Sequence, residues 1–214
     1  MIITNDDELQ EEFLTKLTDL YSRQYKDIHV SDLTLCLRQA AYKKLCPKRT
    51  TLEQLNFFVD GACRDMAIKE VYGNKGVKKL FMGIRMSTDV TASDGFPIEM
   101  KSTRASNGIS DHYLTQLTIY MVLQDMREGH LIIQRIVPKQ ITVTEKQPPF
   151  EFKRIIIDED EFQKIKYTTE TNRDILKTAL AEKNPLLCPV VHKKDSWVCK
   201  SCQWNSPAEC PDKP

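Results

Sequence analysis

The sequence lacks any run of about 18 apolar residues, which is the length an apolar helix needs to cross a bilayer. Its first residues, 1–8, are acidic and have none of the apolar core of a signal peptide. We therefore expect a cytoplasmic protein that makes no membrane contact. Internal repeats and low-complexity segments are also absent, which argues against a repeat architecture.

Net charge is nearly absent too, because 31 Lys and Arg stand against 30 Asp and Glu, leaving +1. This balance gives no global attraction to nucleic acid, so any contact with DNA must come from local basic patches. The candidate patches are the pairs Lys43-Lys44, Lys48-Arg49, Lys78-Lys79 and Lys193-Lys194. The length of 214 residues fits one globular domain with an appendage.

Hydrophobic periodicity predicts the secondary structure. Apolar residues at helical spacing predict helices near residues 6–25, 31–46, 51–72, 111–126 and 158–183, with Ser31 as the expected N-cap of the second. Short apolar runs bounded by turn residues predict strands near residues 82–92, 96–102, 131–137, 140–144 and 150–157. Gly73 and Gly129 are expected to end the helices that precede them.

A short loop, Ser93 to Gly95, separates the first two predicted strands. An Asp-Gly pair between two such runs is a strong hairpin signal, and a left-handed Gly95 sets the register. That register places Asp89 directly opposite Glu99, with the two Cβ atoms about 5 Å apart on one face. Lys101 follows Glu99 by two residues, so its side chain points to the same face.

Two opposed carboxylates destabilise a hairpin unless something neutralises them. A divalent cation between them removes the repulsion, and hard oxygen ligands suit Mg²⁺ or Mn²⁺. Such an ion polarises a phosphoryl oxygen and lowers the pKa of a bound water. Lys101 could then orient this water or stabilise charge on the phosphate. The alternative is a solvated strand face with an incidental salt bridge.

These residues resemble a known nuclease superfamily. Asp89, followed by the run Pro97 to Lys101, resembles the Asp…Glu-x-Lys core of the PD-(D/E)XK nucleases. Gln116 and Tyr120 resemble the Gln-x-x-x-Tyr motif of the RecB-like branch, and their spacing puts both on one helix face. The resemblance implies an α/β fold, with a mixed, twisted sheet flanked by helices. It also implies a catalytic site made of Asp89, Glu99, Lys101, Gln116 and Tyr120.

The sequence departs from this family at one expected metal ligand. Members of the branch usually carry a histidine four residues after a glycine, on the helix before the hairpin. Here Gly61 is followed at that distance by Asp65. Aspartate is a competent hard ligand, so the resemblance implies Asp65 as a further metal ligand beside Asp89 and Glu99. The alternative is an exposed helix residue paired with Lys69 at i+4.

Seven cysteines are an odd number, and an intracellular location argues against a disulfide framework. Cys199, Cys202 and Cys210 lie close in sequence and supply three soft ligands. A tetrahedral zinc site or an iron–sulfur cubane needs a fourth. A local fourth ligand, from Cys188 or His192, would give a zinc site.

A remote fourth ligand would be Cys36. The CRISPR-associated iron–sulfur exonuclease family has one cysteine near the N-terminus and three near the C-terminus. The chain resembles that pattern at Cys36, Cys199, Cys202 and Cys210, over about residues 28–214. The resemblance implies a [4Fe–4S] cluster; zinc and [2Fe–2S] are the alternatives. The gap of seven residues between Cys202 and Cys210 is longer than the family commonly shows.

We therefore expect one integrated domain in three parts. Residues 1–75 form a helical part with the first cluster cysteine, residues 76–184 a RecB-like nuclease core, and residues 185–214 a cysteine-bearing tail.

The resemblance implies metal-dependent trimming of single-stranded DNA ends during CRISPR adaptation, with the CRISPR integrase complex as a partner. One alternative is a RecB-like nuclease of repair, recombination or viral origin. Another is a catalytically weak DNA-binding scaffold that keeps the fold and the cluster.

Overall fold

The computed structural model describes residues 7–21, 26–48, 50–73, 76–103, 108–136, 149–191, 197–200 and 202–211. The predicted strand at 140–144, His192 and Lys193-Lys194 lie outside these ranges. Within them, no helix is both long enough and apolar enough to cross a bilayer.

The helices agree with the periodicity of the sequence, except that the helix predicted from Ser31 to Cys46 is a 3-10 turn followed by a separate α-helix, which Cys36 caps. They are α1 (Asp7–Tyr21), η1 (Val30–Leu33), α2 (Leu37–Leu45), α3 (Leu52–Tyr72), α4 (Asp111–Leu123), α5 (Glu159–Ala181), η2 (Pro185–Leu187) and α6 (Trp197–Lys200). Thr51 caps α3 by accepting from the backbone N–H of Gln54, and Gly73 ends that helix in the left-handed conformation, with φ 61°. Gly129 does not end α4, contrary to expectation. That helix ends at Gln124, and Gly129 lies inside the next strand.

The strands form two mixed sheets. The first has the order β1-β3-β2, from β1 (Ile28–His29), β2 (Lys78–Phe81) and β3 (Ile84–Ser87). The second has the order β4-β5-β6-β7, from β4 (Val90–Thr91), β5 (Pro97–Thr103), β6 (Glu128–Arg135) and β7 (Phe150–Ile156). In the second sheet β5 and β6 are parallel, whereas both outer pairs are antiparallel.

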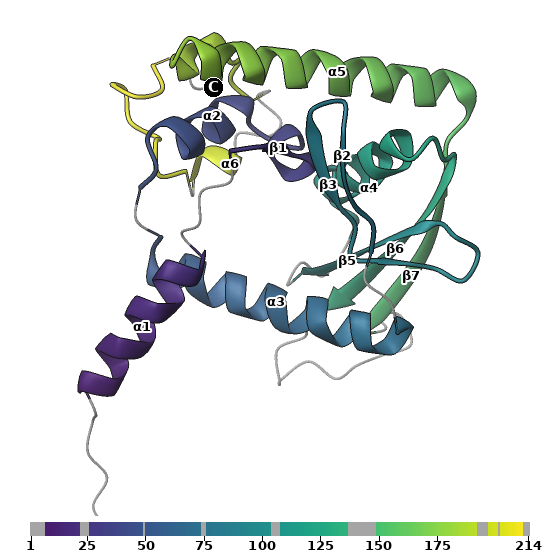
Figure 1. Ribbon diagram of the computed structural model, residues 1–214, viewed down its shortest axis with the longest axis horizontal. Helices are drawn as coiled ribbons and strands as arrows, with labels where there is room; N and C mark the ends of the chain where they lie inside the picture. The colour runs from purple at the N-terminus through teal and green to yellow at the C-terminus, as the bar shows by residue number, and fades with distance from the viewer. Residues whose placement is uncertain are drawn as a thin grey trace, which may run out of the picture.

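Helices cover both faces of the second sheet (Figure 1). The crossover from β5 to β6 runs through α4, as a parallel pair requires. On one face α4 and α5 bury an apolar cluster that includes Leu117, Leu131 and Phe162. On the other face Ile68 of α3 packs with Ile98 of β5. The chain therefore has the α/β fold with mixed sheets flanked by helices that we expected.

The predicted strand over residues 82–92 is wrong in one respect, because the structure divides it between the two sheets. Thr88 lies at the break, where its Oγ1 accepts from the N–H of Val77 at 2.9 Å. The chain at Gly76 presses against this break, and a Cβ there would stand 2.1 Å from the carbonyl oxygen of Thr88. Only glycine fits at so close an approach. Because of this bend, Asp89 lies directly before the start of β4.

The β2–β3 hairpin was not predicted. It turns at Met82 and Gly83, both with positive φ, 55° and 74°. A Met-Gly pair carries a weaker hairpin signal than Asn-Gly or Asp-Gly, so residues 78–81 were not recognised as a strand.

Candidate active site

The β4–β5 hairpin has the register that the sequence predicts. Val90 pairs with Ile98, and the N–H of Ala92 donates to the carbonyl oxygen of Phe96 at 2.9 Å. Gly95 has φ 89°, the left-handed value that the loop requires. Continuing the register by one residue sets Asp89 opposite Glu99.

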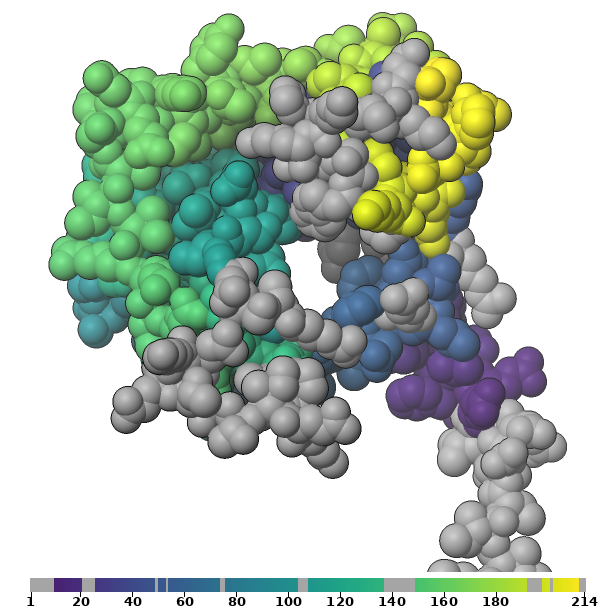
Figure 2. Space-filling model, turned by 180° about the vertical axis from the view of Figure 1, so that it is seen from behind, coloured from purple at the N-terminus to yellow at the C-terminus, as the bar shows by residue number. Residues whose placement is uncertain are grey.

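All five predicted catalytic residues line one cavity, together with Asp65. The walls come from α3, β4–β5 and α4, and the lining residues are Gly61, Arg64, Asp65, Ser87, Asp89, Glu99, Met100, Lys101, Ser102, Gln116 and Tyr120. The cavity has a volume of about 210 Å³. Figure 2 shows the hollow between α3 (blue) and the part of the molecule that carries α4 (teal). Residues distant in sequence thus converge on one place.

Glu99 is the most buried polar residue of this cavity, with 1% exposure. Its Oε1 forms an ion pair with Lys101 Nζ. Its Oε2 is buried and has no hydrogen-bond partner among the described residues. Burial raises the pKa of Glu99 to about 8, outweighing the opposing effect of the Lys101 charge. A buried carboxylate oxygen without a partner is costly, and a cation would satisfy it.

Asp89 is fixed beside Glu99. Its Oδ2 accepts a hydrogen bond from the backbone N–H of Met100 at 2.8 Å. Burial raises the pKa of Asp89 above its usual range, although the Met100 hydrogen bond lowers it. The cavity therefore contains two carboxyl groups whose pKa values are raised by burial. The donor set therefore fits a divalent cation, which favours the ionised form of both.

Gln116 and Tyr120 extend the wall of the cavity from α4. Gln116 Nε2 donates to the Tyr120 hydroxyl oxygen at 3.1 Å, and the two residues are 8% and 4% exposed. Burial and the nearby Glu99 charge raise the pKa of Tyr120. Tyr120 is therefore a neutral hydroxyl that can donate a hydrogen bond into the site.

Asp65 lines the cavity and also forms the ion pair of the alternative interpretation. Its charge contributes to the raised pKa values of Asp89 and Glu99. The ion pair joins it to Lys69, one turn along α3. The Lys69 ammonium therefore competes with any cation for the Asp65 carboxylate.

Sequence reasoning missed Arg64 as a lining residue. Its guanidinium donates to Ser102 Oγ at 2.6 Å and pairs with Asp60 on the preceding turn. Its position in the sequence could have indicated this, because Arg64 directly precedes Asp65, the expected metal ligand.

A second candidate metal site lies between the β4–β5 turn and the start of β6. Single ligand atoms of Asp94, Glu128 and His130 lie within 4.8 Å of one another. His130 Nε2 is 3.0 Å from Asp94 Oδ2. The Glu128 carboxylate is already held by Arg154, with Nη2 donating to Oε2 at 2.7 Å. This arginine competes with any cation for the same carboxylate.

The four cysteines predicted to bind a cluster line another cavity together. Its lining residues are Cys36, Arg38, Gln39, Tyr42, Val198, Cys199, Cys202, Trp204, Asn205 and Cys210. Cys188 is buried nearby but does not line it. All seven cysteines lie in the described ranges, and none of them forms a disulfide. Within those ranges, no three cysteine sulfurs lie within 4.8 Å of one another.

Side chains from the N-terminal part hold the cysteine-bearing tail in place. The Tyr42 hydroxyl donates to the carbonyl oxygen of Glu209, and Lys48 Nζ pairs with the Glu209 carboxylate at 2.8 Å. Trp204 is 3% exposed, donates its indole N–H to the Cys46 carbonyl at 3.2 Å and stacks on Tyr42. The tail is thus ordered by protein contacts, with the stacked rings closing one wall of the cavity.

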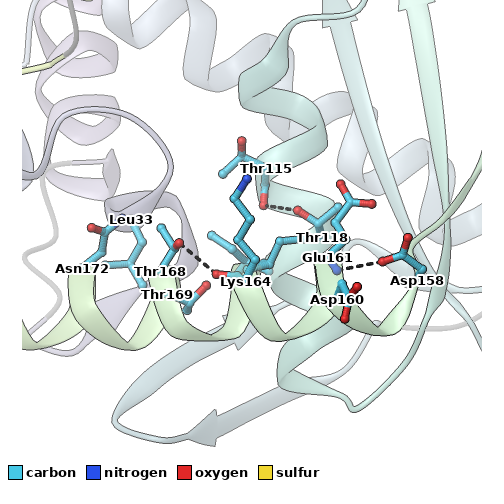
Figure 3. Close-up of a pocket in the computed structure, with 12 residues that line it drawn as sticks. Leu33, Thr115, Thr118, Asp158, Asp160, Glu161, Lys164, Thr168, Thr169 and Asn172 are labelled. Carbon is cyan, nitrogen blue, oxygen red and sulfur yellow. Dashed lines mark hydrogen bonds between the residues drawn. The ribbon is translucent and has the colours of Figure 1, made fainter.

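A cavity of about 590 Å³, larger than that of the candidate active site, lies between α4 and α5 (Figure 3). Lys164 reaches from α5 toward Thr115 of α4, and the Thr118 hydroxyl donates to the Thr115 carbonyl at 3.2 Å. The acids Asp158, Asp160 and Glu161 line one end. No residue predicted to act in catalysis or metal binding lines this cavity.

Comparisons with known proteins reveal a likeness of fold. No protein-family model matches the sequence, and no curated protein matches it. The crystal structure of SSO0001 superposes with a TM-score of 0.59 and 20% identity, covering 96% of each chain. The alkaline exonuclease LHK-Exo from Laribacter hongkongensis gives a TM-score of 0.47 and 12% identity, over 81% of this chain and 95% of that one. A phage related exonuclease from Haemophilus somnus 129PT gives 0.47 and 12%, over 78% and 100%.

Proposed function

We propose that the protein is a metal-dependent DNA nuclease of the PD-(D/E)XK type that trims single-stranded ends. One observation carries this proposal. Glu99 has a buried, unpartnered carboxylate oxygen in a cavity that it shares with Asp89, Lys101, Gln116 and Tyr120. A purely structural ion pair of Glu99 with Lys101 would not need a second carboxylate beside it.

The site's own residues would hold the ion and the substrate. Asp89 and Glu99 are the proposed ligands of Mg²⁺ or Mn²⁺, and Asp65 is a third if it leaves Lys69. When bound, the ion supplies Lewis-acid activation of the phosphate and a water of lowered pKa. Releasing Glu99 from its ion pair frees the Lys101 ammonium to face the phosphate, where it stabilises the developing charge.

Further groups suit a DNA backbone. Arg64 lines the cavity, and guanidinium groups match phosphate oxygens in charge and geometry. The Gln116 amide and Tyr120 hydroxyl supply neutral hydrogen bonds beside the carboxylates. With a net charge of only +1, these local groups must provide the attraction for DNA.

We propose that Cys36, Cys199, Cys202 and Cys210 bind a [4Fe–4S] cluster. Four thiols on one cavity are a suitable donor set. In a tetrahedral zinc site with Zn–S bonds of 2.3 Å, the sulfurs lie about 3.8 Å apart. Among the described residues, no three of the cysteine sulfurs lie within 4.8 Å of one another, as the ligands of such a zinc site would. In a cubane each thiolate binds its own iron, so wider spacing is suitable.

The pathway is also a proposal. The cysteine pattern together with the nuclease motifs resembles the CRISPR-associated exonucleases, so we propose a cytoplasmic role in CRISPR adaptation beside the integrase complex. The Asp65–Lys69 ion pair favours a second candidate, a DNA-binding scaffold with weak catalysis, because it withholds one ligand from the metal.

A nuclease assay tests the main proposal. Purified protein is incubated with Mn²⁺ and end-labelled single-stranded DNA, with Glu99→Gln as the matched inactive variant. Products that shorten progressively from an end, only with metal and only with the unsubstituted protein, would support trimming. DNA binding without cleavage, in both Mn²⁺ and Mg²⁺, would favour the scaffold.

A further inference from the structure

The cysteine cavity contains a buried cation that the proposed function does not use. Arg38 follows Cys36 by two residues on α2 and is 5% exposed. Its Nε–H donates to the Cys188 carbonyl oxygen at 3.0 Å, and Nη2 donates to the Leu186 carbonyl oxygen at 3.5 Å. These two bonds hold the guanidinium plane. The remaining donor, Nη1, lies 3.7 Å from Cys210 Sγ.

We propose that Arg38 controls the electrostatics of the metal centre at this cavity, which rests on the cluster proposed above. Its N–H group orients the Cys210 thiolate, and its charge offsets the negative charge of the cluster. A [4Fe–4S] cluster with four thiolates is anionic, and hydrogen bonds to its sulfurs together with nearby charge set its reduction potential. Arg38 is therefore a positioning residue that raises the potential.

Among the proposed ligands, Cys210 is the one whose sulfur most requires a positioning contact. Seven residues separate Cys210 from Cys202, whereas only two separate Cys202 from Cys199. The Cys210 backbone N–H donates to the Ser206 carbonyl at 2.8 Å, which fixes the turn but not the sulfur. Arg38 supplies the missing restraint on the sulfur.

The charge itself adds a second effect. A guanidinium stays protonated under all ordinary conditions, and burying it is costly unless anionic groups or good acceptors surround it. Two carbonyl oxygens accept hydrogen bonds from it. Thiolates formed on metal binding would supply negative charge at the same place. Arg38 and an anionic cluster therefore stabilise each other.

A matched control separates this role from simple docking of the tail. Lys48 is also a cation that holds the tail, but through the Glu209 carboxylate and the Gln203 carbonyl, and it donates to no described cysteine sulfur. Lys48→Met removes a tail contact. Arg38→Met removes a tail contact, a charge beside the cluster and a hydrogen bond to sulfur.

The experiment measures the reduction potential of the anaerobically purified full chain by spectroelectrochemical titration, with iron and sulfide content and the rate of bleaching by a chelator. We expect Arg38→Met to shift the potential to more negative values and to bleach about tenfold faster or more, in line with other groups that orient metal ligands. Lys48→Met should keep the potential.

Equal potentials in the unsubstituted protein and Arg38→Met would overturn the proposal, as would an equal shift in Lys48→Met. If Arg38→Met does not fold, Arg38→Gln provides the same test, since it keeps an N–H donor and removes the charge. An unchanged potential in Arg38→Gln would then overturn the role of the charge. Colourless, iron-free protein without any substitution would instead overturn the cluster itself.

Discussion

Asp89 Oδ2 accepts the backbone N–H of Met100 at 2.8 Å, and Met100 lies between Glu99 and Lys101 on β5. One strand therefore carries a proposed ligand and the proposed lysine, and it also anchors the second carboxylate. Because a strand alternates its faces, Glu99 and Lys101 point into the cavity while the Met100 side chain points to α3. The relative positions of these groups are set by backbone pairing rather than by flexible side chains.

Asp89→Asn and Glu99→Gln are each expected to abolish cleavage without unfolding the protein, because each removes an anionic ligand from one metal centre. Their combined effect should be no larger than either alone, since either change empties the same site. Cleavage of labelled single-stranded DNA in Mn²⁺ is the measurement. Glu128→Gln is the control, and it should keep activity. Loss of cleavage in Glu128→Gln, with activity kept in Glu99→Gln, would move the metal to the Asp94 cluster.

Lys101→Ala should slow cleavage by about 10²–10³, the usual effect of removing one stabiliser of transition-state charge. Its Mn²⁺ affinity, measured by titration calorimetry, should stay close to that of the unsubstituted protein, because Lys101 is not a ligand. A collapse of Mn²⁺ affinity would mean that Lys101 organises the carboxylates and does not act on the phosphate.

Lys69→Met tests the role of Asp65. Since Lys69 holds the Asp65 carboxylate in an ion pair, its removal should free that carboxylate for the cation and tighten Mn²⁺ binding severalfold. Lys69→Met combined with Asp65→Asn should lose the gain. Unchanged Mn²⁺ affinity in the single variant would exclude Asp65 from the metal site.

The stability of the metal-free protein should depend on pH through Glu99. The unfolded carboxyl loses its proton near 4.5, whereas burial raises the pKa in the fold to about 8. Between these values the folded state binds more protons than the unfolded state, so stability falls as pH rises. Glu99→Gln cannot ionise and should therefore remove much of this fall, which is of the order of a few kcal/mol.

Urea unfolding at about pH 5 and about pH 8, with a chelator present, measures this difference. Glu99→Gln should gain stability relative to the unsubstituted protein at the higher pH. Saturating Mn²⁺ should reverse the order, because the ion stabilises only a protein that keeps its ligand. Parallel pH profiles for the two proteins would show that Glu99 is not the titrating group.

Cys36→Ser should bleach the protein as completely as Cys199→Ser, although the two cysteines are far apart in sequence. Both line the same cavity, and loss of one thiolate leaves a cubane without one of its four ligands. Absorption spectra and iron analysis are the measurements, with Cys188→Ser as the control that keeps its colour. Zinc in a colourless protein, lost in Cys188→Ser and kept in Cys36→Ser, would favour the local zinc site.

The hairpin of the candidate site could be predicted because local rules determine it. Asp94-Gly95 sets the turn and the turn sets the register, so Asp89 falls opposite Glu99 with no long-range information. The i, i+4 spacing of Gln116 and Tyr120 is equally local. Their convergence with Glu99 depends on the β5–α4–β6 crossover, which joins two parallel strands and is not a local feature of the sequence.

Other features depend on contacts that no local pattern records. At the break, Val77 exchanges hydrogen bonds with Thr88, and the Gly76 N–H donates to the Asp89 carbonyl oxygen. The apolar run of residues 82–92 looks continuous in sequence because nothing within it records these contacts. The choice of Asp65 between Lys69 and the cavity is likewise set by the distance between α3 and β5. Arg64 was overlooked because a basic residue on a helix is most often solvated.

Helix α2 is complete by Leu45, yet its partners come much later in the chain. The contacts of Arg38 with Cys188 and Cys210, and of Tyr42 with Glu209, span 150, 172 and 167 residues. During synthesis, Arg38 and Tyr42 cannot form these contacts until nearly all of the described chain has left the ribosome. Closing so long a loop is entropically costly and slow. In a nascent chain the cysteine cavity is therefore incomplete until the last cysteines emerge, so the proposed cluster would be inserted late.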